Sequence, residues 1–163
     1  TNPCPVGSAD IVFVIDSSGS VPTRSLRSAG LFASLFLQGL ADQSVCFRAA
    51  AIIFSTGPRL MFDFSQFSAG NLSGAREILE SLPYIGEYTR PSTALEFVQH
   101  NLLASRNSSA PALVLLATDG HVQDAVQLIA DVSNVQSAAT LYGIGFGTLN
   151  TSALGLYLPV DHI

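Results

Sequence analysis

Basic residues are scarce in this sequence. Only seven of the 163 residues are Lys or Arg, and the formal net charge is −5 at pH 7. Nucleic-acid binding relies on a basic surface that contacts phosphates, and here the basic residues are not clustered. The charge balance therefore argues against a nucleic-acid partner and suits the binding of a cation better.

Long apolar runs are also missing. The longest runs, at residues 49–54 and 113–117, are much shorter than the roughly 20 residues needed to cross a bilayer, so we expect no direct membrane insertion. Charged residues make up 12% of the chain and hydrophobic residues 48%, which is typical of a packed globule and not of a disordered segment. We expect residues 1–163 to form a single domain.

The two cysteines, Cys4 and Cys46, allow one disulfide or two buried thiols. Cys4 precedes the first expected strand and Cys46 lies at the start of the second. If those strands are neighbours, their N-terminal ends meet and a disulfide is favoured. Three sequons, at Asn71, Asn107 and Asn150, are candidate glycosylation sites and point to an extracellular protein.

Apolar strands alternate with helical patterns along most of the chain. Continuous or β-branched apolar runs predict strands at residues 9–16, 45–54, 59–64, 112–118 and 139–146. Apolar residues at helical spacing predict helices at residues 22–41, 71–82, 93–104 and 122–132, with a weak helix near 152–157. This alternation predicts a doubly wound α/β domain with a mostly parallel sheet covered by helices on both faces. The short turn at residues 55–58 predicts one antiparallel edge pair.

Two acidic residues fall where strands end. Asp16 closes the first expected strand, and Asp119 directly follows the fourth. In open parallel sheets, ligands bind in the crevice outside the carboxyl ends of the strands. The two carboxylates are therefore a candidate site, although Asp16-Ser-Ser-Gly-Ser20 read alone is also a helix-capping turn.

Four short segments carry a resemblance to a known family. Asp16-Ser-Ser-Gly-Ser20 and Thr118-Asp119-Gly120 resemble the metal-ion-dependent adhesion site of von Willebrand factor A-type (integrin I-like) domains. The segment Thr89-Arg-Pro-Ser-Thr-Ala-Leu95 is similar to the family's Thr-x-Thr-Gly-x-Ala-Leu segment, and Tyr142-Gly-Ile-Gly145 to its late glycine-rich strand. The resemblance extends from residue 9 to residue 162 and implies a Rossmann-like vWA fold.

The resemblance implies a set of metal ligands. Ser18, Ser20 and Thr89 are expected to bind the ion through their hydroxyls, and Asp16 mainly through water. Asp119 is expected either to complete the ligand shell directly or to approach the ion through water. All-oxygen ligation suits Mg²⁺, with Mn²⁺ as a close substitute and Ca²⁺ as a further candidate. Zinc is disfavoured because Cys and His ligands are lacking.

The sequence departs from the family pattern in the Thr89 segment. Pro91 and Ser92 replace a Thr and a Gly, so the loop is expected to be stiffer, and Thr93 is the alternative ligand if its register shifts. The resemblance also implies that the family's final strand and C-terminal helix are not contained in this sequence. Next to the expected metal, the candidate ligand-rim residues are Tyr88, Arg90 and His121.

The leading functional hypothesis is an extracellular adhesion or matrix-binding module that uses a divalent cation to bind a Glu or Asp of a protein partner, such as collagen or another matrix or cell-surface protein. The alternatives are an intracellular scaffold of the same fold and a metal-independent matrix binder. An enzyme is not expected, since no second acid two residues after Asp16, no phosphate-loop lysine and no Ser-His-Asp motif is present.

Overall fold

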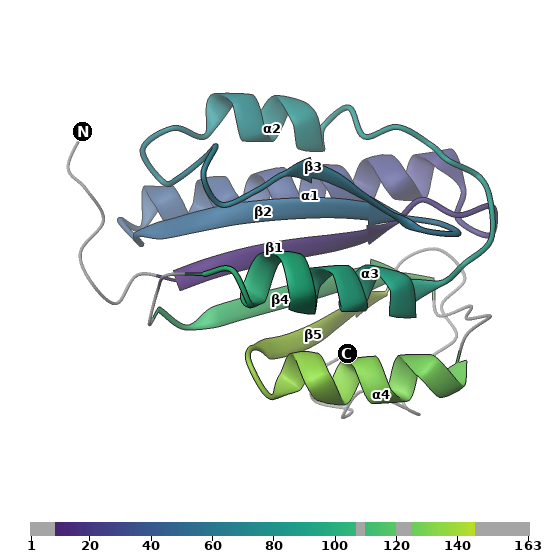
Figure 1. Ribbon diagram of the computed structural model, residues 1–163. Coiled ribbons are helices and arrows are strands. Elements are labelled where there is room, and N and C mark those ends of the chain that lie inside the picture. Colours follow the sequence, from purple (N-terminus) through teal and green to yellow (C-terminus); the bar gives the residue numbers. More distant parts are fainter. Residues whose placement is uncertain (1–8, 107–109, 120–124, 146–163) are drawn as a thin grey trace.

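A computed structural model describes residues 9–106, 110–119 and 125–145. Its centre is a five-stranded sheet in the order β3-β2-β1-β4-β5 (Figure 1). The strands are β1 (Ala9–Asp16), β2 (Phe47–Phe54), β3 (Pro58–Phe62), β4 (Ala112–Thr118) and β5 (Thr140–Gly145). All neighbouring pairs are parallel except β2 and β3, which are antiparallel. The predicted fold class, with its antiparallel edge pair, is confirmed.

Helices cover both faces of this sheet. One face packs against α1 (Thr23–Asp42) and α2 (Ser73–Leu79), and the other against α3 (Pro91–Phe97), the π-helix η1 (Val98–Leu103) and α4 (Ala125–Gln136) (Figure 1). Among the described residues, no helix combines the length and apolar character that a membrane span requires.

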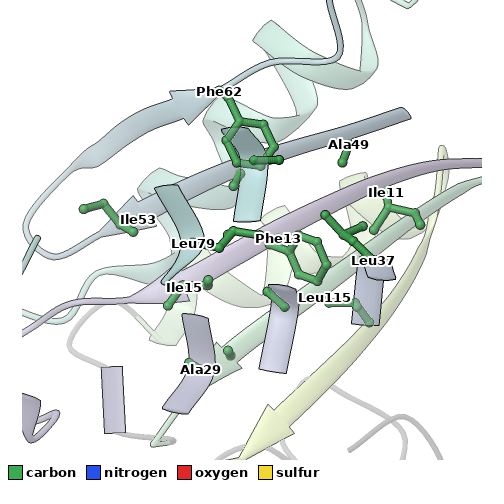
Figure 2. Close-up of a cluster of buried hydrophobic side chains, with 14 of the residues drawn as sticks. Ile11, Phe13, Ile15, Ala29, Leu37, Ala49, Ile53, Phe62, Leu79 and Leu115 are labelled. Carbon is green, nitrogen blue, oxygen red and sulfur yellow. The ribbon is translucent and has the colours of Figure 1, made fainter. Parts of the chain in front are cut away.

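The two sheet faces use alternate residues of the same strand. In β1, Ile11, Phe13 and Ile15 belong to the cluster under α1 and α2, shown in Figure 2, whereas Val12 and Val14 face α3 and α4. Successive side chains of a strand point to opposite faces, so a strand buried on both sides must be apolar throughout. The apolar runs in the sequence are therefore continuous because both faces of these strands are buried.

Several predicted boundaries need correction. Pro22 is the extended residue before α1 and not part of its first turn. The helix predicted at 71–82 covers only Ser73–Leu79. The helix predicted at 93–104 begins earlier, at Pro91, and its second half is the π-helix η1. The helix predicted at 122–132 runs over Ala125–Gln136 in the described part, and the weak helix near 152–157 lies outside the described residues.

Candidate metal centre

Three neighbouring strands bring their carboxyl ends to one edge of the sheet. Asp16, the last residue of β1, pairs with Phe54, the last residue of β2, and Ile15 pairs with Ala117 of β4. Asp119 follows directly after β4 and is buried. The strand order alone therefore gathers the Asp16-Ser-Ser-Gly-Ser20 turn and Asp119 at one end of the domain.

Three hydroxyl groups converge at this edge. The Ser18 and Ser20 oxygens are 3.2 Å apart, those of Ser20 and Thr89 are 3.2 Å apart, and the Thr89 hydroxyl donates to that of Ser18 at 2.8 Å. Neighbouring ligands of an octahedral ion with bonds of about 2.0–2.1 Å lie roughly 2.8–3.0 Å from each other. The Thr89–Ser18 distance falls within this range, and the two distances to Ser20 lie slightly above it, so the three oxygens are close to the spacing of one octahedral face. The donor set is the hard, all-oxygen type that suits Mg²⁺.

Asp16, the last residue of β1, is fully buried. Its Oδ1 accepts the backbone N–H of Ser18, and its Oδ2 accepts the hydroxyl of Thr118, each at 2.9 Å. Burial raises the pKa of Asp16, and the charge of Asp119 adds to this effect, while the hydrogen bonds from Ser18 and Thr118 oppose it. A nearby cation would favour the ionised form of this carboxyl group.

The loop that carries Thr89 packs against the Asp16 turn. The Gly19 N–H donates to the carbonyl of Glu87 at 2.8 Å, and a Cβ on Gly19 would lie 2.9 Å from the carbonyl oxygen of Gly86. Gly86 has φ +80°, in the region that favours glycine. The Asp16 turn and the Thr89 loop can lie this close because Gly19 has no side chain to clash with the backbone of Gly86.

The structure also answers the question of loop register. Pro91 is the first residue of α3, where the missing N–H would have no intrahelical partner in any case. The Thr93 hydroxyl donates to the carbonyl of Arg90, one turn back along the chain. Thr89, and not Thr93, is the threonine hydrogen bonded to Ser18 and Ser20.

Comparison with known proteins agrees with this architecture. The profile of the von Willebrand factor type A domain matches residues 10–156. The chain belongs to this family. It is 32% identical to human von Willebrand factor A domain-containing protein 2 over 73% of its length, and 31% identical to the mouse collagen alpha-4(VI) chain over 76%. It spans only 16% and 6% of these two relatives.

A solved structure shares the fold of this vWA domain. Proximal thread matrix protein 1 from the mussel byssus superposes with a TM-score of 0.74 at 19% sequence identity, over 96% of this chain and 42% of that one. Such a likeness concerns the fold alone.

The rim of the vWA domain's candidate site is only partly described. Tyr88 is 60% exposed, and the Arg90 guanidinium lies 5.8 Å from the centre of its ring. A cavity of about 580 Å³ beside them is lined by Thr56, Gly86, Glu87 and Tyr88. His121 lies outside the described residues. Within the described ranges, no group of three or more His, Cys, Asp or Glu residues could hold a metal, so the candidate centre rests on its hydroxyls.

Among the remaining predicted positions, Cys46 lies just before β2, at the opposite end of the sheet from Asp16. The Ala9 N–H donates to the carbonyl of Cys46, so the N-terminal ends of β1 and β2 do meet. Cys4 is outside the described residues, and its pairing with Cys46 stays a prediction. Of the three sequons, the one at Asn71 has an exposed asparagine, while Asn107 and Asn150 are outside the described residues.

Two residues of the site are absent from the sequence-based prediction. Ser17 lies inside the Asp16 turn and Ser55 directly follows β2, and both are buried and hydrogen bonded to the Thr89 loop. Their position at strand ends was a signal available in the sequence. Their partners in the loop were not, since these lie more than 30 residues away.

Proposed function

We propose that this vWA domain is a non-catalytic, extracellular adhesion or matrix-binding module that holds one divalent cation and binds an acidic group of a protein partner. The observation that carries the proposal is the spacing of the Ser18, Ser20 and Thr89 hydroxyls, 2.8 to 3.2 Å apart. This spacing lies close to the roughly 2.8–3.0 Å between neighbouring ligands of a single octahedral ion.

The charges at the site favour an anionic partner. Asp16 and Asp119 would balance a divalent cation formally, while the three hydroxyl ligands are uncharged. Bound Mg²⁺ or Mn²⁺ would supply a Lewis-acidic position open to a further oxygen, and the carboxylate of a partner's Glu or Asp is the natural ligand for it. The residues of this chain hold and orient the ion, and Asp16 is oriented in turn by Ser18 and Thr118.

The rim offers contacts for the residues beside that acidic group. Tyr88 and Arg90 are exposed next to Thr89, and aromatic and Arg side chains are the usual anchors of interfaces. The cavity lined by Thr56, Gly86, Glu87 and Tyr88 could receive a flanking side chain of the partner. The similarity to a collagen chain and the exposed sequon at Asn71 support an extracellular matrix setting.

The decisive experiment is calorimetric titration of the chelator-stripped domain with Mg²⁺ and Mn²⁺. We expect one site, and we expect Ser20→Ala and Thr89→Ala to weaken it by at least about tenfold, because each removes a direct ligand. Ser65→Ala is the matched control, since Ser65 is an exposed serine whose hydroxyl bonds to Asp63, away from the candidate centre.

A folded wild type that takes up neither cation would overturn the proposal. If the cation binds, attachment of the domain to immobilised collagens and other matrix proteins is compared in Mg²⁺ and in EDTA. Attachment that survives EDTA would point to a metal-independent binding face instead.

A further inference from the structure

We propose that Ser17 and Ser55 are positioning residues that hold the loop of residues 83–90 in the register in which Thr89 meets Ser18 and Ser20. This inference rests on the metal site proposed above. Neither serine belongs to the expected ligand set, and the hydrogen bonds of both side chains go to the loop backbone.

Ser55 holds the part of the loop around Thr89. Its hydroxyl donates to the carbonyl of Tyr88 at 2.8 Å and accepts the N–H of Glu87 at 3.0 Å. Its own carbonyl accepts the N–H of Arg90 at 3.0 Å. Ser55 therefore bonds to the residues immediately before and after Thr89, which leaves the threonine little freedom to move along the chain direction.

Ser17 holds the beginning of the same loop. Its hydroxyl donates to the carbonyl of Pro83 and accepts the N–H of Ile85, both at 2.9 Å. Its carbonyl accepts the N–H of Gly86 at 2.9 Å. Residues 82–90 contain no helix or strand. The bonds to Ser17 and Ser55 therefore satisfy backbone N–H and C=O groups of the loop that secondary structure would otherwise pair.

Both serines are anchored in the sheet. Ser17 follows β1 and Ser55 follows β2, the last residues of these strands are paired, and the Ser17 N–H donates to the carbonyl of Phe54 at 2.8 Å. A serine hydroxyl donates and accepts at once, which is why one side chain can satisfy both a carbonyl and an N–H of the loop. Alanine can do neither, so each substitution would remove two partly buried hydrogen bonds to the loop.

The test is a double-mutant cycle between Ser55 and Thr89, read out as Mn²⁺ affinity by titration. We expect Ser55→Ala to weaken Mn²⁺ binding about three- to tenfold, the equivalent of one ordinary hydrogen bond. In the Thr89→Ala background the same substitution should change the affinity less than twofold, because the residue that Ser55 positions is gone. Ser17→Ala is a second variant with the same expectation.

Ser34→Ala is the matched control. Ser34 is equally buried and its hydroxyl bonds to Glu80 and Arg76, but it lies on α1, away from the loop. We expect it to lower stability without changing Mn²⁺ affinity. Equal weakening by Ser34→Ala and Ser55→Ala, or a Ser55→Ala penalty that persists without Thr89, would overturn the inference.

A measurement on the wild type covers the case in which the serine variants do not fold. Hydrogen exchange should find the Glu87 and Arg90 amides protected like sheet amides although they lie in a loop, and rapid exchange there would overturn the inference. If the wild type binds no Mn²⁺, the metal site itself fails. If it binds Mn²⁺ and Ser55→Ala binds equally well, only the positioning role fails.

Discussion

The hydroxyl of Thr118 donates to the Oδ2 of Asp16 at 2.9 Å, a bond between residues 102 positions apart. It exists because β1 and β4 are adjacent parallel strands that end side by side. Asp16 also accepts the Ser18 N–H, so its carboxylate is oriented by both the turn and the neighbouring strand. Burial nevertheless raises the pKa of Asp16, so without a cation its ionised form is less favoured in the folded protein than in the unfolded chain.

The first prediction concerns the stability of the cation-free domain. A carboxyl group whose folded pKa is raised stabilises the fold at low pH, and that stability is lost as the pH rises through the folded pKa. We therefore expect Asp16→Asn in chelator at pH 7 to melt at a higher temperature than the wild type, and the difference to shrink on acidification. Calorimetry across pH measures both.

Addition of Mg²⁺ should reverse the order of the two melting temperatures, so that the wild type melts above Asp16→Asn. A free concentration of 100 times Kd should stabilise the wild type by about 2.7 kcal/mol and Asp16→Asn much less. Equal stabilisation of both proteins would contradict the assignment of Asp16 to the site.

The second prediction concerns the contact between α1 and α2. A Cβ on Gly30 would lie 2.0 Å from the carbonyl oxygen of Leu79, which is backbone and cannot simply rotate away. We expect Gly30→Ala to lower the free energy of unfolding by about 1–3 kcal/mol, because the two helices must separate. Gly39→Ala on the same helix is the control. A Cβ at Gly39 would meet nothing within 4 Å. Because alanine favours the helix more than glycine does, this substitution should stabilise the domain by about 0.5–1 kcal/mol. Urea unfolding of both variants checks the pair.

The third prediction concerns Asp10 at the opposite end of the sheet. Its fully buried carboxylate accepts two hydrogen bonds from Arg48 and one from Arg106, each at 2.8 Å. Burial alone would raise the pKa of Asp10, but these bonds and charges outweigh it and hold the pKa below its ordinary value. Asp10→Asn leaves the guanidinium groups without their counter-charge, and we expect a loss of about 3 kcal/mol.

The pH dependence of the Asp10 contribution has the opposite sign to that of Asp16. A lowered folded pKa gives stability that is present above the unfolded pKa and lost as the pH falls through the folded value. The difference in unfolding free energy between wild type and Asp10→Asn should therefore shrink in acid. If the difference in unfolding free energy stays constant as the pH is lowered, the ion pairs of Asp10 are not the cause of the difference.

The fourth prediction concerns glycosylation at Asn71. The preceding residues 67–69 lie beside the start of β2, since Ala69 donates to Phe47 and Ala49 to Phe67, so Asn71 is far from the strand ends that carry Asp16. Expression in a secretory cell line should add a glycan that Asn71→Gln removes, as a mass shift will show. Loss of this glycan should leave Mn²⁺ affinity unchanged. A fully unmodified asparagine in the secreted protein would weigh against the extracellular assignment.

Much of the fold follows from local patterns. The bounds predicted for β1 and β4 match the structure, because strands buried on both faces must be apolar at every position. The helix predicted at residues 71–82 was too long, yet Leu72 and Leu82, which lie outside α2, still pack on the core. Apolar spacing thus predicts which residues are buried better than it predicts where the backbone stops being helical. The apolar spacing at residues 93–104 predicted a helix, but nothing in that local pattern distinguishes the π-helix η1 from an α-helix.

The sequence by itself determined the alternation of strands and helices, the acidic residues at strand ends, and the hydroxyls in the Asp16 turn, since these depend on residue type and short spacing. The family resemblance implied that Thr89 would lie near Ser18, and the tertiary structure brings the two hydroxyls together. Only the tertiary structure decided that Thr118 orients Asp16 and that Ser17 and Ser55 hold the loop. Each of these contacts joins segments more than 30 residues apart. They arise from the order of strands in the sheet, which brings distant strand ends together.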